Sequence, residues 1–173
     1  ALDGIHTCFY LIHSLLLGRQ DFHDADNDAA RNFMRAAEKN NVQRIIYLGG
    51  LGDVTTKLSD HLYSRMQVAG ELSKGNVPVT VLRAAIIIGS GSAPYEIIKH
   101  IVTKIAIINV PGLANNRCQP IAIRDTIKYL VGCLETPATS GKAFDIGGKD
   151  ILSYRQMMEV FAVIMGKKRI FIS

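Results

Sequence analysis

The sequence alternates between long apolar segments and amphipathic helical segments, and this alternation most constrains the fold. Residues 5–12, 44–48 and 77–88 are nearly continuous runs of apolar and aromatic side chains. Such runs are typical of strands that are covered on both faces, as in a parallel sheet. The stretches between them exceed the roughly dozen residues that a parallel crossover needs. The sequence therefore predicts three parallel strands of an α/β fold.

Two helices are predicted between these strands. In residues 24–39, apolar side chains recur at helical spacing, with acidic residues at the start and basic residues at the end. A second helix is expected over residues 59–74, with Gly75 as its stop. Right-handed strand–helix–strand connections place helices on both faces of the sheet, so a doubly wound parallel sheet is predicted. The inward face of the second helix is expected to carry Leu62, Met66, Ala69 and Leu72.

The second half of the chain is less regular. Pro94 suits the first turn of a helix, residues 143–146 suit a short strand, and Ser153–Gln156 is a capping-box pattern. Because no internal repeat or low-complexity linker is present, residues 1–173 are predicted to form a single domain. The inward faces of three helices are predicted to carry Ile97, Ile98, Ile101 and Ile105, then Ile127, Leu130, Val131 and Leu134, then Met157, Val160, Phe161 and Ile164.

Composition argues against several classes of protein. The chain has 173 residues, of which 48% are hydrophobic and 20% are charged, as expected of a globular rather than a disordered chain. Its three cysteines are far apart and odd in number, which argues against a disulfide scaffold or a zinc cluster and favours the reducing cytoplasm. The longest apolar run, residues 105–110, is much shorter than the roughly 20 residues that span a bilayer. Neither a membrane span nor a metal site is predicted.

The net charge of +5 arises in the second half of the chain. Residues 1–86 carry nine basic and nine acidic side chains, whereas residues 87–173 carry eleven and six. We interpret the basic run Lys167–Arg169 as a solvated helix end, because no stripe of basic and aromatic residues accompanies it. A nucleic-acid partner is therefore not expected.

Ligands of parallel α/β sheets bind outside the carboxyl ends of the strands. Small residues occupy two of those ends, at Gly49–Gly50 and at Ala84–Ala85. They let a flat ligand lie close to the backbone, although glycines at a strand end can also serve only to turn the chain. Together, at neighbouring strands, they favour a nucleotide-binding crevice.

A glycine- and serine-rich segment, Gly89–Ser92, precedes the helix that begins near Pro94. A helix N-terminus can hold an anion, so this segment invites comparison with a phosphate-binding loop. It lacks the lysine of a Walker loop and the spacing of the dinucleotide-binding fingerprint. We therefore interpret it as a turn near the substrate side.

Five stretches, in order along the chain, carry a family pattern: Phe9–Ser14, Asp26 with Ala29–Phe33, Arg44–Gly52, Leu82–Ser92 and Gln119–Asp125. In these stretches the sequence resembles the atypical short-chain dehydrogenases/reductases. Its nearest branch is the NmrA-like NAD(P)-binding proteins, which are often described as nucleoside-diphosphate-sugar epimerases. The resemblance implies a Rossmann-type fold with NAD or NADP as cofactor.

The same resemblance implies that the chain begins just before the fourth strand of the family sheet. The glycine-rich loop of the family, between its first strand and first helix, has no counterpart in this sequence. Because that loop and helix hold the dinucleotide phosphates, we expect this chain alone to bind a dinucleotide weakly.

Active members of the family use a serine after the fifth strand and a tyrosine followed four residues later by lysine. Here the serine position falls at Leu48–Gly50, which carries no side-chain hydroxyl, and Tyr63 is followed by Gln67. His61 is likewise followed by Arg65, whose high pKa makes it a poor proton relay. Tyr63 is the candidate general acid/base, with a partly buried surface aromatic as the equal alternative.

The remaining candidate site residues are assigned from their positions at strand ends and from the family resemblance. For Arg117 the alternative is a solvated loop charge, and for Gln119 it is a structural turn before Pro120. The cofactor-binding candidates are His13, Ser14, Gly49, Gly50, Arg65, Gln67, Ala84, Ala85 and Ile86. The substrate-side candidates are Ser90, Tyr95, Arg117 and Gln119.

The sequence leaves three functions open. The first is an oxidoreductase that transfers hydride to or from a small or nucleotide-linked substrate. The second is a non-catalytic NAD(P)-binding module that reports redox state or supports a complex, which the missing serine and lysine favour. The third is a nucleoside-diphosphate-sugar epimerase. A homo-oligomer stays open as well, because an apolar helical stripe fits a core or a second copy equally.

Overall fold

The computed structural model describes residues 2–12, 22–52, 59–109 and 116–172. The chain divides into two compact units. The first unit comprises Ala1–Ala84 and Lys128–Ile146, and the second comprises Ala85–Ile127 and Gly147–Ser173. Each unit contains a hydrophobic cluster of its own.

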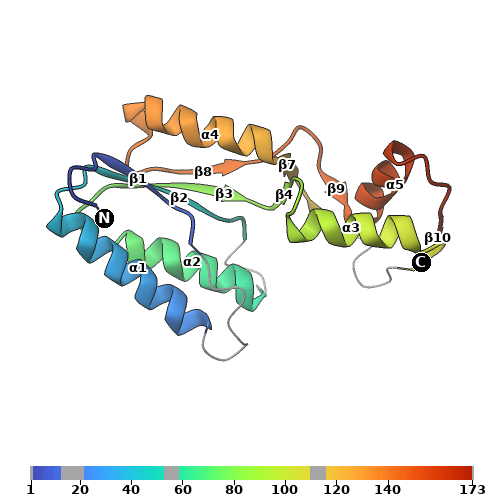
Figure 1. Ribbon diagram of the computed structural model, residues 1–173, viewed down its shortest axis with the longest axis horizontal. Helices are drawn as coiled ribbons and strands as arrows, with labels where there is room; N and C mark the ends of the chain where they lie inside the picture. Colours follow the sequence, from blue (N-terminus) through green and yellow to red (C-terminus); the bar gives the residue numbers. More distant parts are fainter. Residues whose placement is uncertain (1, 13–21, 53–58, 110–115, 173) are drawn as a thin grey trace. The chain divides into compact units, whose positions relative to one another are not determined.

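A four-stranded parallel sheet forms the centre of the first unit, in the order β1-β2-β3-β8. Helices α1 and α2 lie on one face of this sheet, and the part of α4 from Lys128 onward lies on the other (Figure 1). This is the doubly wound arrangement that the sequence predicts. The strands are β1 (Thr7–Tyr10), β2 (Arg44–Gly50), β3 (Val79–Ala84) and β8 (Ala143–Ile146); the helices are α1 (Phe22–Lys39), α2 (Asp60–Leu72), α4 (Ile123–Glu135) and the 3₁₀ turn η1 (Pro137–Thr139).

The core of the first unit lies between the sheet and the pair α1 and α2. Parallel strands put alternate residues on one face, and β2 and β3 carry β-branched or aromatic side chains there. The fully buried side chains of this core include Tyr10, Ile45, Tyr47, Val68 and Leu72.

Two of the predicted strands differ from the observed ones. The run at residues 5–12 forms a strand only over Thr7–Tyr10, and Phe9 is 39% exposed, because β1 is an edge strand of the described sheet. The run at residues 77–88 is divided at Ala85 into β3 and β4 (Ile86–Ile88). The cause is a change of partner: β3 pairs with β2 and β8, whereas β4 pairs with β7 (Pro120–Ala122).

Polar side chains define both the start and the buried face of helix α2. Ser59 caps it by accepting a hydrogen bond from the Leu62 N–H at 3.3 Å, and the helix ends at Leu72, before Gly75. Its fully buried face carries Ser64, Val68 and Leu72, whereas Met66, which was predicted to face inward, is half-buried. A hydrogen bond explains the difference: the Ser64 hydroxyl donates to the Asp26 carboxylate of α1 at 3.0 Å.

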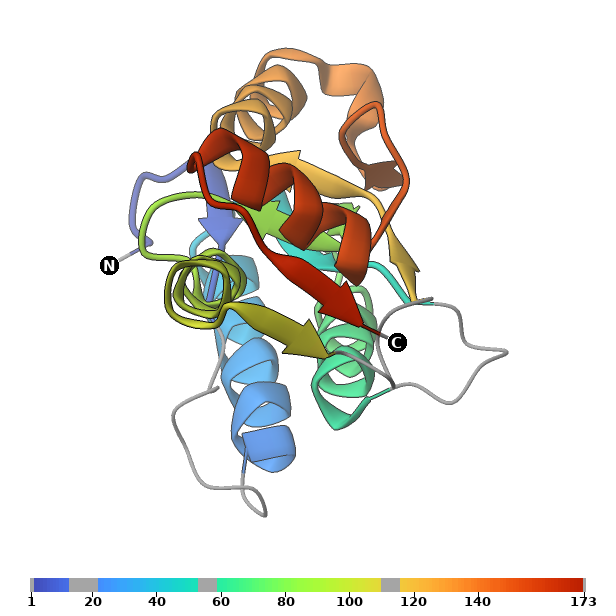
Figure 2. The same ribbon diagram turned by 90° about the vertical axis from the view of Figure 1, so that its right-hand side faces the viewer.

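The second unit contains helices α3 and α5 and three two-stranded sheets. Strands β5 and β10 run parallel beside each other (Figure 2). The predicted capping box is confirmed, since Ser153 and Gln156 each accept the other's backbone N–H. The elements are α3 (Ala93–Lys104), β5 (Ile107–Asn109), β6 (Arg117–Cys118), β9 (Leu152–Ser153), α5 (Tyr154–Ile164) and β10 (Ile170–Ile172).

Helical spacing located the later helices but placed some inward faces wrongly. In α3 the buried residues are Ile98 and Val102, whereas Ile97 is 58% exposed. The pattern marks an apolar stripe but not which edge of the stripe meets the core. The other predicted inward residues that are exposed are Ile105, Ile127, Val131, Leu134, Val160 and Ile164. Among the described residues, no helix has the length and apolar character needed to cross a bilayer.

Candidate functional site

The small residues predicted at two strand ends lie side by side. Gly50 at the end of β2 is the register partner of Ala84 at the end of β3. The Leu51 N–H extends this pairing by donating to the Ala84 carbonyl at 2.9 Å. The carboxyl ends of β2 and β3 therefore form one continuous edge lined by backbone and small side chains.

Helix α2 packs directly against this edge. A Cβ atom added at Gly50 would lie 2.9 Å from Cδ2 of Leu62 and 3.6 Å from Cβ of Arg65. Ordinary carbon contacts begin near 3.4 Å, so the Leu62 methyl group fills the space next to Gly50 and would have to move for a larger residue at this position. Gly50 thus brings the side chains of α2 to the end of the strands.

Arg65 connects α2 to the strand ends. Its guanidinium donates hydrogen bonds to the Leu48 carbonyl and, at 3.5 Å, to the Ile12 carbonyl. Its Cζ lies 5.2 Å from the centroid of the Tyr47 ring, and the Tyr47 hydroxyl donates to the Arg65 carbonyl at 3.0 Å. The side chain is half-buried and directed at backbone carbonyls. Contact with a ribose or phosphate stays a prediction for this residue.

Tyr63 and Gln67 lie one turn apart on α2, with different surroundings. Tyr63 is 52% exposed, so its phenol is accessible to a ligand from solvent. The Gln67 side-chain oxygen accepts a hydrogen bond from the Asn27 amide of α1 at 3.3 Å. Gln67 therefore joins the two helices, and its side chain is uncharged.

The remaining candidates lie in the second unit, except His13 and Ser14, which lie outside the described residues. Ala85 is half-buried at the junction of β3 and β4, and Ile86 is buried and pairs with Pro120. Next to this pair, the Gln119 amide donates to the Gly148 carbonyl at 2.5 Å. Gln119 is thus held in the turn that precedes Pro120.

Tyr95, Ser90 and Arg117 are not brought to one place by contacts with each other. The Tyr95 ring packs edge-on against Phe161 of α5, with ring centroids 5.4 Å apart. Ser90 is exposed in the turn before α3, where the Gly91 N–H donates to the Glu96 carboxylate at 3.3 Å. Arg117 is exposed on β6. A carboxylate bound to this turn disfavours an anion there.

The sequence interpretation missed a buried polar cluster beneath α2. Tyr10 and Tyr47 are register partners on β1 and β2, with ring centroids 5.8 Å apart. Asp26 and Ser64, which are 3% and 0% exposed, form their hydrogen bond in the same core layer. Burial raises the pKa of Tyr47 to about 12, although the Arg65 charge acts to lower it. The sequence signal that could have revealed this cluster was the presence of a tyrosine in each of two apolar runs.

No group of three or more His, Cys, Asp or Glu side chains in the described parts of the chain could hold a metal ion.

Comparison with known proteins identifies the fold. No protein-family model and no curated protein sequence matches the chain. Solved structures do. A nucleoside-diphosphate-sugar epimerase from Staphylococcus aureus has a TM-score of 0.80 at 16% identity, over 99% of this chain and 57% of that one. UDP-glucuronic acid 4-epimerase from Bacillus cereus, in complex with NAD, has a TM-score of 0.78 at 19% identity, over 99% and 64%.

A third similar structure is the NAD-dependent NDP-hexosamine 5,6-dehydratase TunA, with a TM-score of 0.74 at 17% identity, over 98% of this chain and 64% of that one. The chain thus spans 57% to 64% of the length of these three structures. At such identities the likeness shows the fold, which is a Rossmann-type α/β fold.

Proposed function

We propose that the chain binds NAD along the carboxyl ends of β2 and β3, as an atypical short-chain dehydrogenase/reductase of the NmrA-like branch. The observation that carries the proposal is the pairing of Gly50 with Ala84 at one sheet edge, against which Leu62 and Arg65 of α2 pack. The Rossmann-type fold supports it, and the similar epimerase from Bacillus cereus is a complex with NAD. That complex favours NAD over NADP.

The described residues fit one part of this cofactor better than another. Gly50 and Ala84 keep the strand edge free of long side chains of its own, and Tyr63, on the helix that packs against this edge, is 52% exposed. The described residues offer the pyrophosphate no comparable site, because the sequence lacks the dinucleotide fingerprint and the Glu96 carboxylate of α3 accepts the Gly91 N–H in the turn before this helix. The nicotinamide and its ribose are therefore the parts that this chain is expected to hold.

Bound NAD would supply a hydride acceptor or donor, and the chain would orient a small or nucleotide-linked substrate beside it. Tyr63 is the candidate to exchange a proton with a substrate hydroxyl or carbonyl, since its side chain is accessible from solvent. Sugar nucleotides are the first substrates to try, because epimerases and a dehydratase of such compounds share the fold. A nucleoside-diphosphate-sugar epimerase is therefore one of the enzymes that this proposal covers.

A non-catalytic NAD-binding module is the second candidate, and Gln67 favours it. Gln67 occupies the position at which the family resemblance implies a lysine, and its side-chain oxygen accepts a hydrogen bond from Asn27. The strand end at Gly49–Gly50 also lacks the hydroxyl of an active family member. Without these two groups, cofactor binding would report redox state or stabilise a complex.

Nuclear magnetic resonance titration of the whole chain with NAD and with nicotinamide mononucleotide tests where a cofactor binds. We expect both to shift the backbone amides of Gly49, Gly50 and Leu51, with weak, saturable binding. Adenosine diphosphate should shift these amides much less, since the nicotinamide half is the part held. Shifts confined to the basic run Lys167–Arg169, or none at the strand ends, would overturn the proposal.

A separate assay distinguishes the two candidate functions. Oxidation of NADH and conversion of UDP-sugars are measured for the unaltered chain, for Tyr63→Phe and for Tyr129→Phe. Tyr129 is the matched control because it is also a half-exposed helical tyrosine, 47% exposed, in α4. We expect at least a tenfold loss of turnover for Tyr63→Phe and none for Tyr129→Phe. Strand-end binding without turnover would instead support the non-catalytic module.

A further inference from the structure

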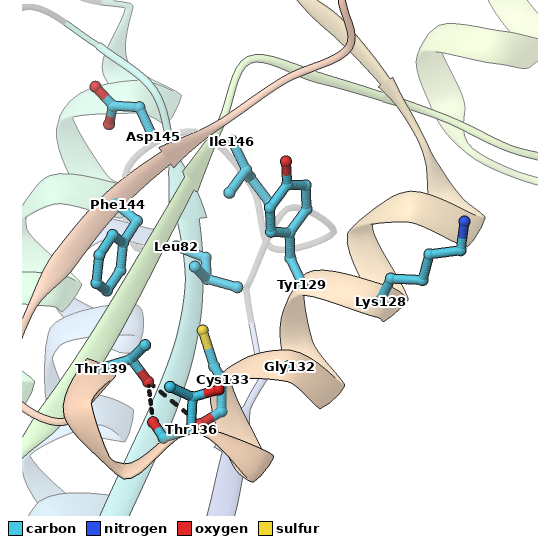
Figure 3. A pocket seen from close by; sticks show the side chains of 10 residues that line it. All are labelled: Leu82, Lys128, Tyr129, Gly132, Cys133, Thr136, Thr139, Phe144, Asp145 and Ile146. Atoms are coloured by element: carbon cyan, nitrogen blue, oxygen red, sulfur yellow. Dashed lines mark hydrogen bonds between the residues drawn. The ribbon is translucent and has the colours of Figure 1, made fainter.

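A cavity of about 300 Å³ lies in the first unit, between α4 and the strands β3 and β8 (Figure 3). Helix α4, whose residues line the cavity, lies on the face of the sheet opposite to α1 and α2 (Figure 1). Neither the resemblance nor the proposed cofactor site involves its lining. Its main walls are Leu82, Tyr129, Gly132, Cys133, Phe144 and Ile146.

Aromatic and aliphatic groups surround the cavity. Phe144 of β8 and Tyr129 of α4 flank it from opposite sides, with Leu82 and Ile146 between them (Figure 3). The Cys133 sulfur points from α4 toward Leu82, and sulfur atoms make favourable contacts with aromatic rings. Two flanking rings and a polarisable sulfur favour a planar aromatic occupant, which can stack or pack edge-on.

Charged groups are directed away from the cavity or already bonded. The Lys128 side chain extends away from the other lining residues (Figure 3). The Asp145 carboxylate pairs with Arg83 at 2.6 Å. At the far wall, the Thr139 hydroxyl donates to the Thr136 carbonyl at 2.7 Å and accepts from Arg44. A charged ligand would lose its hydration here without gaining a partner, so the occupant is expected to be neutral.

Volume limits the size of the occupant. A cavity of roughly 150 Å³ lined by apolar side chains binds benzene. The present cavity, at about 300 Å³, is twice as large and suits two fused rings. It is open to solvent on the side of Tyr129 and Phe144, which are 47% and 36% exposed, so a ligand can enter without unfolding the unit.

We propose that this cavity is a binding site for a neutral, planar, two-ring aromatic molecule, separate from the proposed NAD site. The ligand lies between Phe144 and Tyr129, with its inner edge against Leu82 and Cys133. A single N–H or O–H group on the ring remains at the open side, where the Tyr129 hydroxyl is available to it.

Indole is the probe for this proposal, and Gly132→Leu is the blocking variant. A Cβ at Gly132 would meet no other atom within 4 Å, and Gly132 lines the cavity, so we expect a leucine there to be accepted and to fill part of the cavity. Gly70→Leu is the matched control, because Gly70 is also a helical glycine with open space around its Cβ, in α2. Both changes also raise helix propensity, which protects the fold.

Titration of the whole chain with indole is followed by nuclear magnetic resonance. We expect saturable shifts at the amides of Leu82, Cys133 and Phe144, at least tenfold weaker binding for Gly132→Leu, and binding within twofold of the original for Gly70→Leu. Indole-3-carboxylate should bind at least fivefold more weakly than indole, because the Lys128 side chain extends away from the other lining residues.

Three results would overturn the proposal: no saturable shift at these amides, equal binding by Gly132→Leu, or equal or tighter binding of the carboxylate. Circular dichroism checks that each variant is folded. Should Gly132→Leu fail to fold, Tyr129→Ala removes one flanking ring from an exposed position and must weaken indole binding severalfold. NAD bound at the strand ends should not displace indole, which keeps this test independent of the proposed function.

Discussion

Tyr47 is the residue at which burial has its clearest electrostatic consequence. Its side chain is fully buried in β2, and its hydroxyl donates to the Arg65 carbonyl at 3.0 Å. Burial raises the pKa of this phenol to about 12; the Arg65 charge lowers it, while Tyr10 and Asp26 raise it further. Tyr47 therefore stays protonated at neutral pH and acts as a structural donor rather than as a proton-transfer group.

The raised pKa of Tyr47 predicts a loss of stability in alkali. The unfolded chain ionises near pH 10 and the folded one near pH 12, so the folded state binds more protons between these values and loses stability as pH rises. The loss by pH 12 is about 2–3 kcal/mol, from roughly 1.4 kcal/mol for each pKa unit. Urea unfolding between pH 9 and pH 11 measures the slope. Tyr47→Phe should flatten it, and an unchanged slope would refute this assignment.

Gly148 is required by a close backbone approach. Its N–H donates to the Pro120 carbonyl at 2.9 Å, and a Cβ added there would lie 2.5 Å from the same oxygen. Because a backbone carbonyl cannot move as a flexible side chain does, Gly148→Ala should lower the free energy of unfolding by about 1–3 kcal/mol. Gly70→Ala, with open space around its Cβ, should instead raise it by about 0.5–1 kcal/mol. Thermal or urea unfolding measures both changes. An unchanged free energy of unfolding for Gly148→Ala would contradict the steric explanation.

At the level of elements, a buried arginine joins two strands and a turn. The Arg44 side chain in β2 is 6% exposed and donates to the Thr80 hydroxyl of β3 at 2.9 and 3.2 Å. It also donates to Thr139 in η1 and to the Thr136 carbonyl before it. Removing one acceptor from a buried charged donor costs more than the bond itself contributes. These contacts therefore fix η1 against the start of the sheet.

A double-mutant cycle tests this connection. Thr80→Val preserves the shape of the side chain and favours a strand, so the loss of stability reports the missing hydroxyl, which accepts from Arg44 and donates to the Thr139 carbonyl at 2.9 Å. We expect Thr80→Val to cost about 2–3 kcal/mol in the original chain, because Arg44 loses two bonds. In an Arg44→Met background the same change should cost less than about 1 kcal/mol. Equal costs in the two backgrounds would show that the arginine and threonine are not coupled.

Sequence periodicity predicted which elements form better than it predicted how they pack. Gly50 and Ala84 were expected to meet because neighbouring parallel strands end at one edge, and they do. The division of residues 77–88 at Ala85 was missed, because an apolar run does not show that its strand changes partners. The hydrogen bonds of Arg65 and Gln67 depend on how closely α2 approaches β2 and α1, which spacing along the chain does not encode.

At the scale of the whole molecule, the two units differ in how their backbone is paired. In the first unit, β2 and β3 each pair with two neighbours in a four-stranded sheet. In the second unit, all of the described strands belong to two-stranded sheets. A two-stranded pairing is marginal in water unless side chains cover it, so the second unit depends mainly on the packing of α3 and α5. Its backbone should therefore open at lower cost.

Hydrogen–deuterium exchange of the whole chain tests this difference. Amides of β2 and β3 should be the last to exchange, since their opening requires the sheet of the first unit to separate. Amides of β6 and β9, a pairing of two residues on each side, should exchange first among the strands. Amides of α3 and α5 should exchange at intermediate rates, because each helix contributes a buried residue, Val102 and Met158, to the hydrophobic cluster of the second unit. Equal protection of β2 and β9 would show that the two units open together.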